Sequence, residues 1–104
     1  MSRKKHLEHL QEFKKEIRKR IKIQKMILFG SRASGKPRKE SDFDLLIVSS
    51  DFKGKESVVR GREFYKSWNI NYPVDFLCYT PEEFKRLKKQ PTIVQIAVKE
   101  GKEI

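Results

Sequence analysis

Apolar residues recur at helical spacing in the first part of the chain. Leu10, Phe13, Ile17 and Ile21 follow one another at steps of three or four positions, which places them on one helical face. The spacing predicts a helix over residues 5–22 whose other faces are charged. Its basic residues in the second half are Lys14, Lys15, Arg18, Lys19, Arg20 and Lys22. This basic run is either a solvated helix face or a surface that contacts phosphates or a partner.

Three short apolar runs predict β-strands. They span residues 25–29, 42–48 and 74–79. The connection between the first two, residues 30–41, is rich in Gly, Ser and Pro and predicts a loop, or a loop with one helical turn. Its shortness permits antiparallel pairing, whereas a helix before the third strand permits parallel pairing. The chain is therefore expected to form an α/β (α+β) fold, in which helices pack on a small mixed β-sheet.

Three further helices are predicted in the second half of the chain. Residues 56–68, with Val59, Phe64 and Trp68 among their apolar positions, are expected to form a helix, although Gly61 weakens this prediction. Thr80 begins a capping box with Pro at the first helical position, which predicts a helix to about residue 89. After Pro91, residues 92–99 favour a short helix over a strand.

The composition agrees with one folded domain. The 104 residues are expected to divide into an amino-terminal helix within 1–24 and a core over 25–104. Charged residues make up 38% of the chain, but seven Phe, three Tyr and one Trp argue against disorder. A net charge of +11 points to a polyanionic partner such as nucleic acid, nucleotide or an acidic protein. The alternative is the Lys- and Glu-rich surface of a heat-adapted protein.

Cys78 is the single cysteine of the chain, which excludes an internal disulfide. It lies in an apolar run, so a buried and inert thiol is expected. No secretory signal precedes the basic start, and no apolar run approaches the ~20 residues of a membrane span. These features predict a cytoplasmic protein in a reducing compartment.

Gly30 and Ser31 directly follow the first predicted strand. Glycine allows the backbone to approach a ligand closely, and a helical turn after it would direct backbone N–H groups toward an anion. The hydroxyl group of Ser31 adds a hydrogen-bond donor. Taken alone, the pair also fits a plain turn.

Three aspartates are the candidate metal ligands. Asp42 and Asp44 open the second strand, where residues two apart face the same side and Phe43 faces the packing on the other. Carboxylates this close repel each other, and Mg²⁺ bound together with substrate phosphates would relieve the repulsion. Asp75 lies in the apolar third strand, where a carboxylate needs either a base or a metal as its partner. If the second and third strands are neighbours, all three carboxylates share one face.

Together these residues resemble a known signature. Gly30-Ser31, ten residues, then Asp42-x-Asp44, with a later carboxylate at Asp75, is similar to the signature of the DNA polymerase β-like nucleotidyltransferase superfamily. The stretch FGSRASGKPRKESDFDLLIV most closely resembles the minimal nucleotidyltransferases, or MNT proteins, which are commonly paired with a HEPN-domain toxin. The resemblance extends from about residue 21 to the end of the chain.

The resemblance implies a polymerase β-like core and an enzyme that transfers a nucleoside monophosphate, expected to be AMP from ATP. Gly30 and Ser31 would hold the triphosphate, and Asp42 and Asp44 would bind Mg²⁺. The third carboxylate, Asp75, would help to activate the acceptor hydroxyl as a metal ligand or base. The expected acceptor is a hydroxyl of a HEPN-type ribonuclease toxin, which makes this chain its antitoxin, and RNA is a further partner to test.

Four basic residues after Ser31 are candidates for contacting the triphosphate. Arg32 is the first choice, because a guanidinium group can neutralise phosphate charge; a surface arginine is the alternative. Lys36, Arg38 and Lys39 are weaker candidates in the polar loop.

Three rival interpretations have weaker support. Residues 30–36 read G-x-x-x-x-G-K, nearly a phosphate-binding P-loop, but Pro37 stands where Ser or Thr should bind Mg²⁺. A catalytically inactive or RNA-binding module would neutralise its partner by contact, but the complete set of three carboxylates argues against lost activity. An enzyme acting on a small molecule such as an aminoglycoside would be expected to carry a second domain for the acceptor.

Overall fold

The computed structural model describes residues 3–34 and 42–104 of the chain. Nine helices and strands follow one another within these residues, together with two 3₁₀ helices. In chain order they are α1 (Arg3–Ile17), β1 (Lys25–Phe29), α2 (Ser31–Ser34), β2 (Phe43–Val48), η1 (Ser50–Phe52), α3 (Ser57–Arg60), η2 (Arg62–Ser67), β3 (Val74–Tyr79), α4 (Pro81–Leu87), α5 (Ile93–Glu100) and β4 (Lys102–Glu103).

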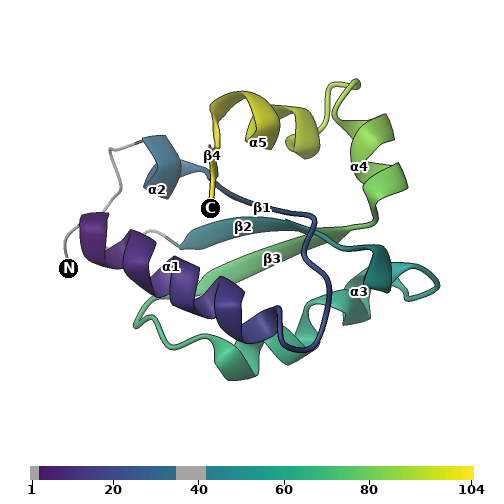
Figure 1. The fold of residues 1–104 in the computed structure, drawn as a ribbon. Helices are drawn as coiled ribbons and strands as arrows, with labels where there is room; N and C mark the ends of the chain where they lie inside the picture. The colour runs from purple at the N-terminus through teal and green to yellow at the C-terminus, as the bar shows by residue number, and fades with distance from the viewer. Residues whose placement is uncertain (1–2, 35–41) are drawn as a thin grey trace.

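The strands form one mixed sheet in the order β3-β2-β1-β4 (Figure 1). β1 pairs antiparallel with β2 and β4, and β2 pairs parallel with β3. The predicted fold class and the three predicted strands are confirmed. β4 was not predicted, because its two polar residues carry no apolar signal and depend on pairing with Ile27 and Leu28 of β1.

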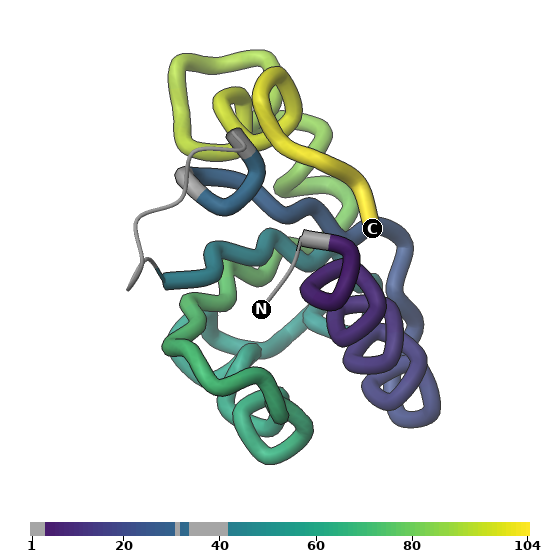
Figure 2. Tube along the Cα trace, turned by 90° about the vertical axis from the view of Figure 1, so that its left-hand side faces the viewer, coloured from purple at the N-terminus to yellow at the C-terminus, as the bar shows by residue number. Residues whose placement is uncertain are grey.

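Helices cover both faces of the sheet. Figure 2 shows α4 and α5 above the strands, and α1 with η2 below them. Side chains of β2 alternate between the two sides: Phe43, Leu45 and Ile47 pack with α1, whereas Leu46 and Val48 pack with α4 and α5. Two apolar cores on opposite faces therefore hold a thin sheet in place, as expected for a strand with period-two alternation.

The core under α1 is largely aromatic. The ring of Phe13 stacks on that of Phe76, with 5.5 Å between centroids. Edge-on contacts with Trp68 and Phe64 lie at 5.2 and 6.5 Å. α1 ends at Ile17, five residues before the predicted end, and a turn follows it. The chain must reverse there to enter β1, and the backbone N–H of Lys22 donates to the Asp51 carboxylate at 2.8 Å.

The predicted helix over residues 56–68 is broken at Gly61 into α3 and η2. A Cβ atom on Gly61 would lie 3.1 Å from Cβ of Phe76 and 3.4 Å from Sγ of Cys78, so the backbone packs directly against β3. This segment also covers the outer edge of β3. Arg60 donates to the carbonyl of Cys78 at 3.2 Å and the Tyr65 hydroxyl to that of Val74 at 3.4 Å, which satisfies edge carbonyls that would otherwise face solvent.

The capping box of α4 is present as predicted. The hydroxyl of Thr80 accepts from the Glu83 N–H at 3.2 Å, and the Glu83 carboxylate accepts from the Thr80 N–H at 2.8 Å. α5 is a helix, as predicted. Cys78 is buried, and burial raises the pKa of its thiol to about 12, so it is the inert thiol expected. Within the described residues, no helix has the length and apolar character needed to cross a membrane.

Candidate functional site

Gly30 joins β1 to the single helical turn α2. Its φ of +78° lies in the left-handed region that favours glycine. The Ala33 N–H donates to the Gly30 carbonyl at 3.1 Å and closes the turn. This confirms the helical turn of the predicted loop, whose residues 35–41 lie outside the described part of the chain. A Cβ atom at position 30 would lie 2.5 Å from Oδ2 of Asp44. Glycine is thus needed here both for its backbone conformation and for its contact with a candidate catalytic carboxylate.

Asp44 and Asp75 lie opposite each other on neighbouring parallel strands. Phe43 is fully buried on the other face, so the alternation predicted for Asp42, Phe43 and Asp44 is correct. Asp42, which directly precedes β2, is exposed, and so is Asp75 in β3. The prediction that burial obliges Asp75 to have a base or a metal as its partner was therefore wrong, because the carboxylate can be solvated. The left end of the sheet in Figure 1 thereby brings together α2 and the starts of β2 and β3.

The charges of the other two carboxylates act on Asp44. The pKa of Asp44 is raised, first by burial and then by the negative charges of Asp75 and Asp42. The pKa of Tyr65 is also raised, by burial and next by the charge of Asp75. Tyr65, whose side chain is 53% exposed, therefore lies near the third carboxylate. The sequence offered no signal for this tyrosine, because a 3₁₀ segment distant from the motif carries it.

Arg32 lies on the other face of the sheet from Asp44. It is only 8% exposed, and its guanidinium group lies 4.8 Å from the ring centroid of Phe43 and 4.4 Å from that of Tyr72. The sequence predicted a contact between Arg32 and the triphosphate, and this burial leaves little of the side chain open to a ligand. Lys36, Arg38 and Lys39 lie outside the described residues, and of Ser31 only the backbone is described.

The donor chemistry of the aspartates fits a hard divalent cation such as Mg²⁺, which prefers carboxylate oxygens and substrate phosphates. Asp44 carries the charge conflict that such a cation would relieve. As their side chains are placed, no three His, Cys, Asp or Glu residues of 3–34 and 42–104 form a closed set of metal ligands.

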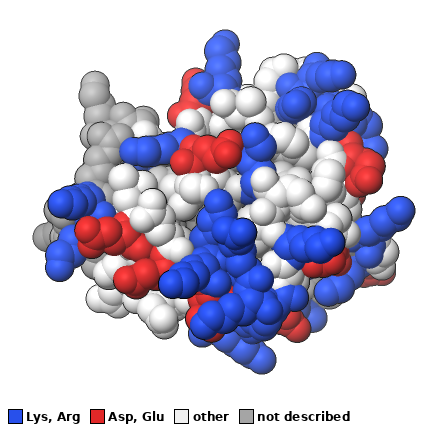
Figure 3. Space-filling model, viewed as in Figure 1, with Lys and Arg blue, Asp and Glu red and all other residues white. Residues whose placement is uncertain are grey.

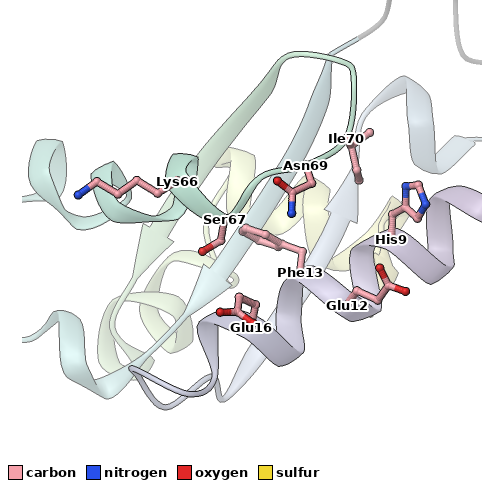
Figure 4. Close-up of a pocket in the computed structure, with 8 residues that line it drawn as sticks. All are labelled: His9, Glu12, Phe13, Glu16, Lys66, Ser67, Asn69 and Ile70. Carbon is pink, nitrogen blue, oxygen red and sulfur yellow. The ribbon is translucent and has the colours of Figure 1, made fainter.

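A large hollow lies away from the carboxylates, between α1 and the segment from η2 to β3 (Figure 4). Its volume is about 400 Å³. The residues lining it are His9, Glu12, Phe13, Glu16, Lys66, Ser67, Asn69 and Ile70. None of the three aspartates lines this hollow, so we assign the candidate site by its chemistry and not by this hollow.

Basic side chains gather across the lower part of the molecule in Figure 3. The exposed members of the basic run at and beyond the end of α1 are Lys15, Arg18, Lys19, Arg20 and Lys22. We call these residues the basic surface. It precedes Lys25, which pairs with Val48, whereas Phe29 at the other end of β1 pairs with Asp44. The basic surface therefore lies at the opposite end of the sheet from the carboxylates.

Comparison with known proteins places this geometry in a family. The sequence profile described as "Nucleotidyltransferase domain" matches residues 10–104. A provisionally assigned nucleotidyltransferase from Sulfolobus solfataricus is 25% identical, with a TM-score of 0.65 over 83% of this chain and 77% of that one. Among proteins of curated function, none matches this sequence.

Two further solved structures share the fold. A structure described as a toxin-antitoxin with AMP-PNP is 22% identical, with a TM-score of 0.62 over 92% of this chain and 69% of that one. BolA1 from Arabidopsis thaliana is 19% identical, with a TM-score of 0.55 over 72% of this chain and 94% of that one. Since these differently described proteins share the architecture, the fold alone does not determine the activity.

Proposed function

The chain belongs to the nucleotidyltransferase domain family, and on this premise we propose that it transfers AMP from Mg²⁺-bound ATP to a hydroxyl group of a protein acceptor. The observation that carries the proposal is the arrangement of Gly30, Asp44 and Asp75. Asp44 lies opposite Asp75 in the sheet, and Gly30 lies so close to Asp44 that any side chain at position 30 would collide with its carboxylate. The Gly30 turn, to which we assign phosphate binding, thus lies beside two carboxylates at one end of the sheet.

Each residue has a distinct task in this reaction. Gly30 and Ser31 hold the triphosphate close to the backbone, and Asp42 with Asp44 provides oxygen ligands for the metal. Bound Mg²⁺ supplies positive charge for the attacking and leaving oxygens. Asp75 orients the acceptor hydroxyl and takes its proton, while the hydroxyl oxygen bonds to the α-phosphorus and pyrophosphate leaves.

We further propose that the acceptor is a HEPN-type ribonuclease toxin, for which this chain is the antitoxin. The sequence resembles the MNT proteins, and a structural neighbour is described as a toxin-antitoxin with AMP-PNP. The net charge of +11 would speed the encounter with an acidic partner. An added AMP would place a bulky anion on the toxin and obstruct its RNA by charge and volume.

The basic surface supports one alternative, a module that binds RNA or its partner without catalysis. One experiment separates the two. The chain is incubated with Mg²⁺-ATP and the protein encoded by the adjacent reading frame, and every product is weighed by mass spectrometry. We expect the neighbour to gain roughly 329 Da, the mass of one AMP.

Three variants control this experiment. Asp42→Ala and Asp75→Ala should add nothing to the neighbour while melting like the wild type. Glu82→Gln, an exposed acid on α4, should transfer normally. Near-normal transfer by Asp42→Ala would contradict the proposed site, label only on RNA would support an RNA acceptor, and binding without any mass gain would support the non-catalytic module.

A further inference from the structure

A cluster of one cation and three rings lies beneath the candidate site, on the α1 face of the sheet. The Arg32 guanidinium contacts the rings of Phe43 and Tyr72 at 4.8 and 4.4 Å. The ring of His6, from the first turns of α1, stands edge-on to both, at 5.2 Å from Phe43 and 5.8 Å from Tyr72. We call these four residues the aromatic clamp.

Three members of the aromatic clamp are sequence neighbours of candidate site residues. Arg32 follows the Gly30-Ser31 pair, and Phe43 separates Asp42 from Asp44. Tyr72 precedes Asp75 by three residues. The aromatic clamp therefore joins, on one face of the sheet, the three segments whose polar residues meet on the other.

Two members of the aromatic clamp, Arg32 and Phe43, are buried, and the other two are partly buried. Arg32 is 8% exposed and Phe43 is fully buried. A cavity of only about 20 Å³ remains beside them, lined by His6, Leu7, Leu10, Leu28, Arg32, Ala33, Phe43 and Lys102. A desolvated cation over two ring faces resists displacement more than an exposed one. The backbone of α2, which begins at Ser31 directly after Gly30, is thereby held against β2 on the α1 face of the sheet.

We propose that Arg32 is a positioning residue, which holds the Gly30-Ser31 turn against Asp44 through the rings of Phe43 and Tyr72 and does not itself contact the triphosphate. This inference rests on the proposed nucleotidyl transfer. It replaces the role that the sequence alone suggested for Arg32. The two roles make different demands on Tyr72. A positioning arginine needs the ring of Tyr72, whereas an arginine that contacts the phosphates would not need it.

The kinetic test compares Arg32→Ala, Tyr72→Leu and the double variant. KM for ATP and kcat are measured for each in the transfer assay. If Arg32 acts through the ring of Tyr72, each single variant raises KM for ATP by about tenfold. The double variant then raises KM no further than either single variant does. A normal KM in Tyr72→Leu, or additive losses in the double variant, would show that Arg32 contacts the nucleotide directly.

Two control variants separate positioning from a general loss of stability. Tyr72→Phe keeps the ring face and should bind ATP as the wild type does. Arg60→Ala removes another buried cation, whose guanidinium lies 6.0 Å from the ring of Phe52 and whose side chain is 9% exposed. It should lower the melting temperature without changing KM for ATP. If Arg60→Ala raises KM as much as Arg32→Ala does, the effect is not specific to the aromatic clamp and the inference fails.

Hydrogen exchange provides a second readout that needs no activity. The Ala33 N–H closes α2 on the Gly30 carbonyl, so its exchange rate reports how firmly the turn is held. Arg32→Ala and Tyr72→Leu should each speed this exchange by about tenfold, and Arg60→Ala should not. Unchanged exchange in both clamp variants would overturn the inference.

The inference and the proposed function fail in different ways. A wild-type chain that transfers no nucleotide removes the proposed function, yet the exchange of Ala33 still decides whether Arg32 and Tyr72 hold the turn. If Arg32→Ala does not fold, Tyr72→Leu carries the kinetic test alone. A raised KM for ATP together with the melting temperature of the wild type then supports the positioning role of Arg32. A normal KM overturns that role.

Discussion

At the scale of single residues, ionised Asp44 carries an electrostatic cost that a bound cation would remove. Burial and the charges of Asp75 and Asp42 raise its pKa above the ordinary 3.8. The native state therefore holds the ionised form less readily than the unfolded chain does. The resulting loss of stability is complete above the folded pKa and disappears as the pH falls below the ordinary value.

Asp44→Asn should accordingly separate stability from activity. We expect the free energy of unfolding at pH 7, without divalent cations, to stay equal or rise, because the neutral amide avoids the repulsion. Transfer should fall at least about a hundredfold, because a metal ligand is lost. Urea melts and the transfer assay measure the two effects. If Asp44→Asn is less stable than the wild type at pH 7 but equally stable at pH 3, the ionised carboxylate stabilises the fold. That result would refute the account.

Gly30 can be tested against a matched glycine. Gly30 and Gly54 both have positive φ values, +78° and +82°, but a Cβ atom at Gly54 would meet nothing within 4 Å. Gly54→Ala should therefore cost only the backbone strain, ~1 kcal/mol. Gly30→Ala should cost more, because its Cβ also collides with the Asp44 carboxylate.

The double variant Gly30→Ala/Asp44→Ala should recover this additional cost, since the colliding carboxylate is gone. Equilibrium urea unfolding gives the free energy of unfolding of the wild type, Gly30→Ala, Gly54→Ala and the double variant. Equal losses in the two single glycine variants would mean that the contact with Asp44 has no energetic weight. Because of this contact, a bulky residue at position 30 would disturb Asp44 even without bound phosphate. Weaker nucleotide binding in such a variant would therefore not by itself identify Gly30 as part of a phosphate-binding turn.

At the scale of elements, Arg60 and Glu83 join α3 to α4 across the edge of β3. The Arg60 guanidinium donates to both carboxylate oxygens of Glu83, at 2.5 and 3.3 Å, and to the carbonyls of Lys55 and Cys78. The hydrogen bond from Arg60 is the largest cause of the lowered pKa of Glu83, whose ordinary value is 4.5. The stability gained from this carboxylate is present above pH 4.5 and is lost as the pH falls through the lower, folded value.

Arg60→Ala should lower the free energy of unfolding by ~1–3 kcal/mol at pH 7, because it removes the donor of three part-buried hydrogen bonds to Cys78 and Glu83. The loss should be smaller at pH 3, where Glu83 is protonated in both states. Urea melts at the two pH values measure it. Lys19→Ala removes an exposed ion pair with Glu16 and should change little, ~0–0.5 kcal/mol. A loss for Arg60→Ala that is the same at both pH values would remove Glu83 from the explanation.

At the scale of the whole molecule, the basic surface and the carboxylates lie at opposite ends of the sheet. The four-residue step from Asp44 to Val48 spans about 13 Å at the rise of an extended strand. A bound nucleotide at the carboxylates is therefore remote from Lys15 and Arg18. We therefore propose that these charges act on a macromolecular partner that is long enough to reach both ends.

Charge reversal on the basic surface should slow modification of the acceptor and spare nucleotide binding. We expect Lys15→Glu/Arg18→Glu to reduce the rate of acceptor labelling about tenfold at low salt, with the difference shrinking as salt is added. KM for ATP should not change. Labelling rates measured over a salt series provide the test. A salt-independent defect, or a raised KM for ATP, would mean that the charge acts through the fold or the site.

The sequence by itself determined those features that depend on local order along the chain. Alternation in β2 placed Phe43 opposite its two aspartates, and the capping box placed the start of α4, because both follow from backbone geometry over a few residues. The spacing of Gly30, Ser31, Asp42 and Asp44 was sufficient to anticipate the family that the profile then matched.

Only the tertiary structure decided what distant segments do to one another. Asp75 became a neighbour of Asp44 through the parallel register of β2 and β3, and Arg32 turned inward because Phe43 and Tyr72 present their rings to it. The predicted helix is broken at Gly61 because β3 packs against the backbone there. β4 forms because its two residues pair with the free edge of β1. Periodicity reports which side of an element is apolar, but not which residue of another element will meet it, since packing across the sheet fixes those contacts.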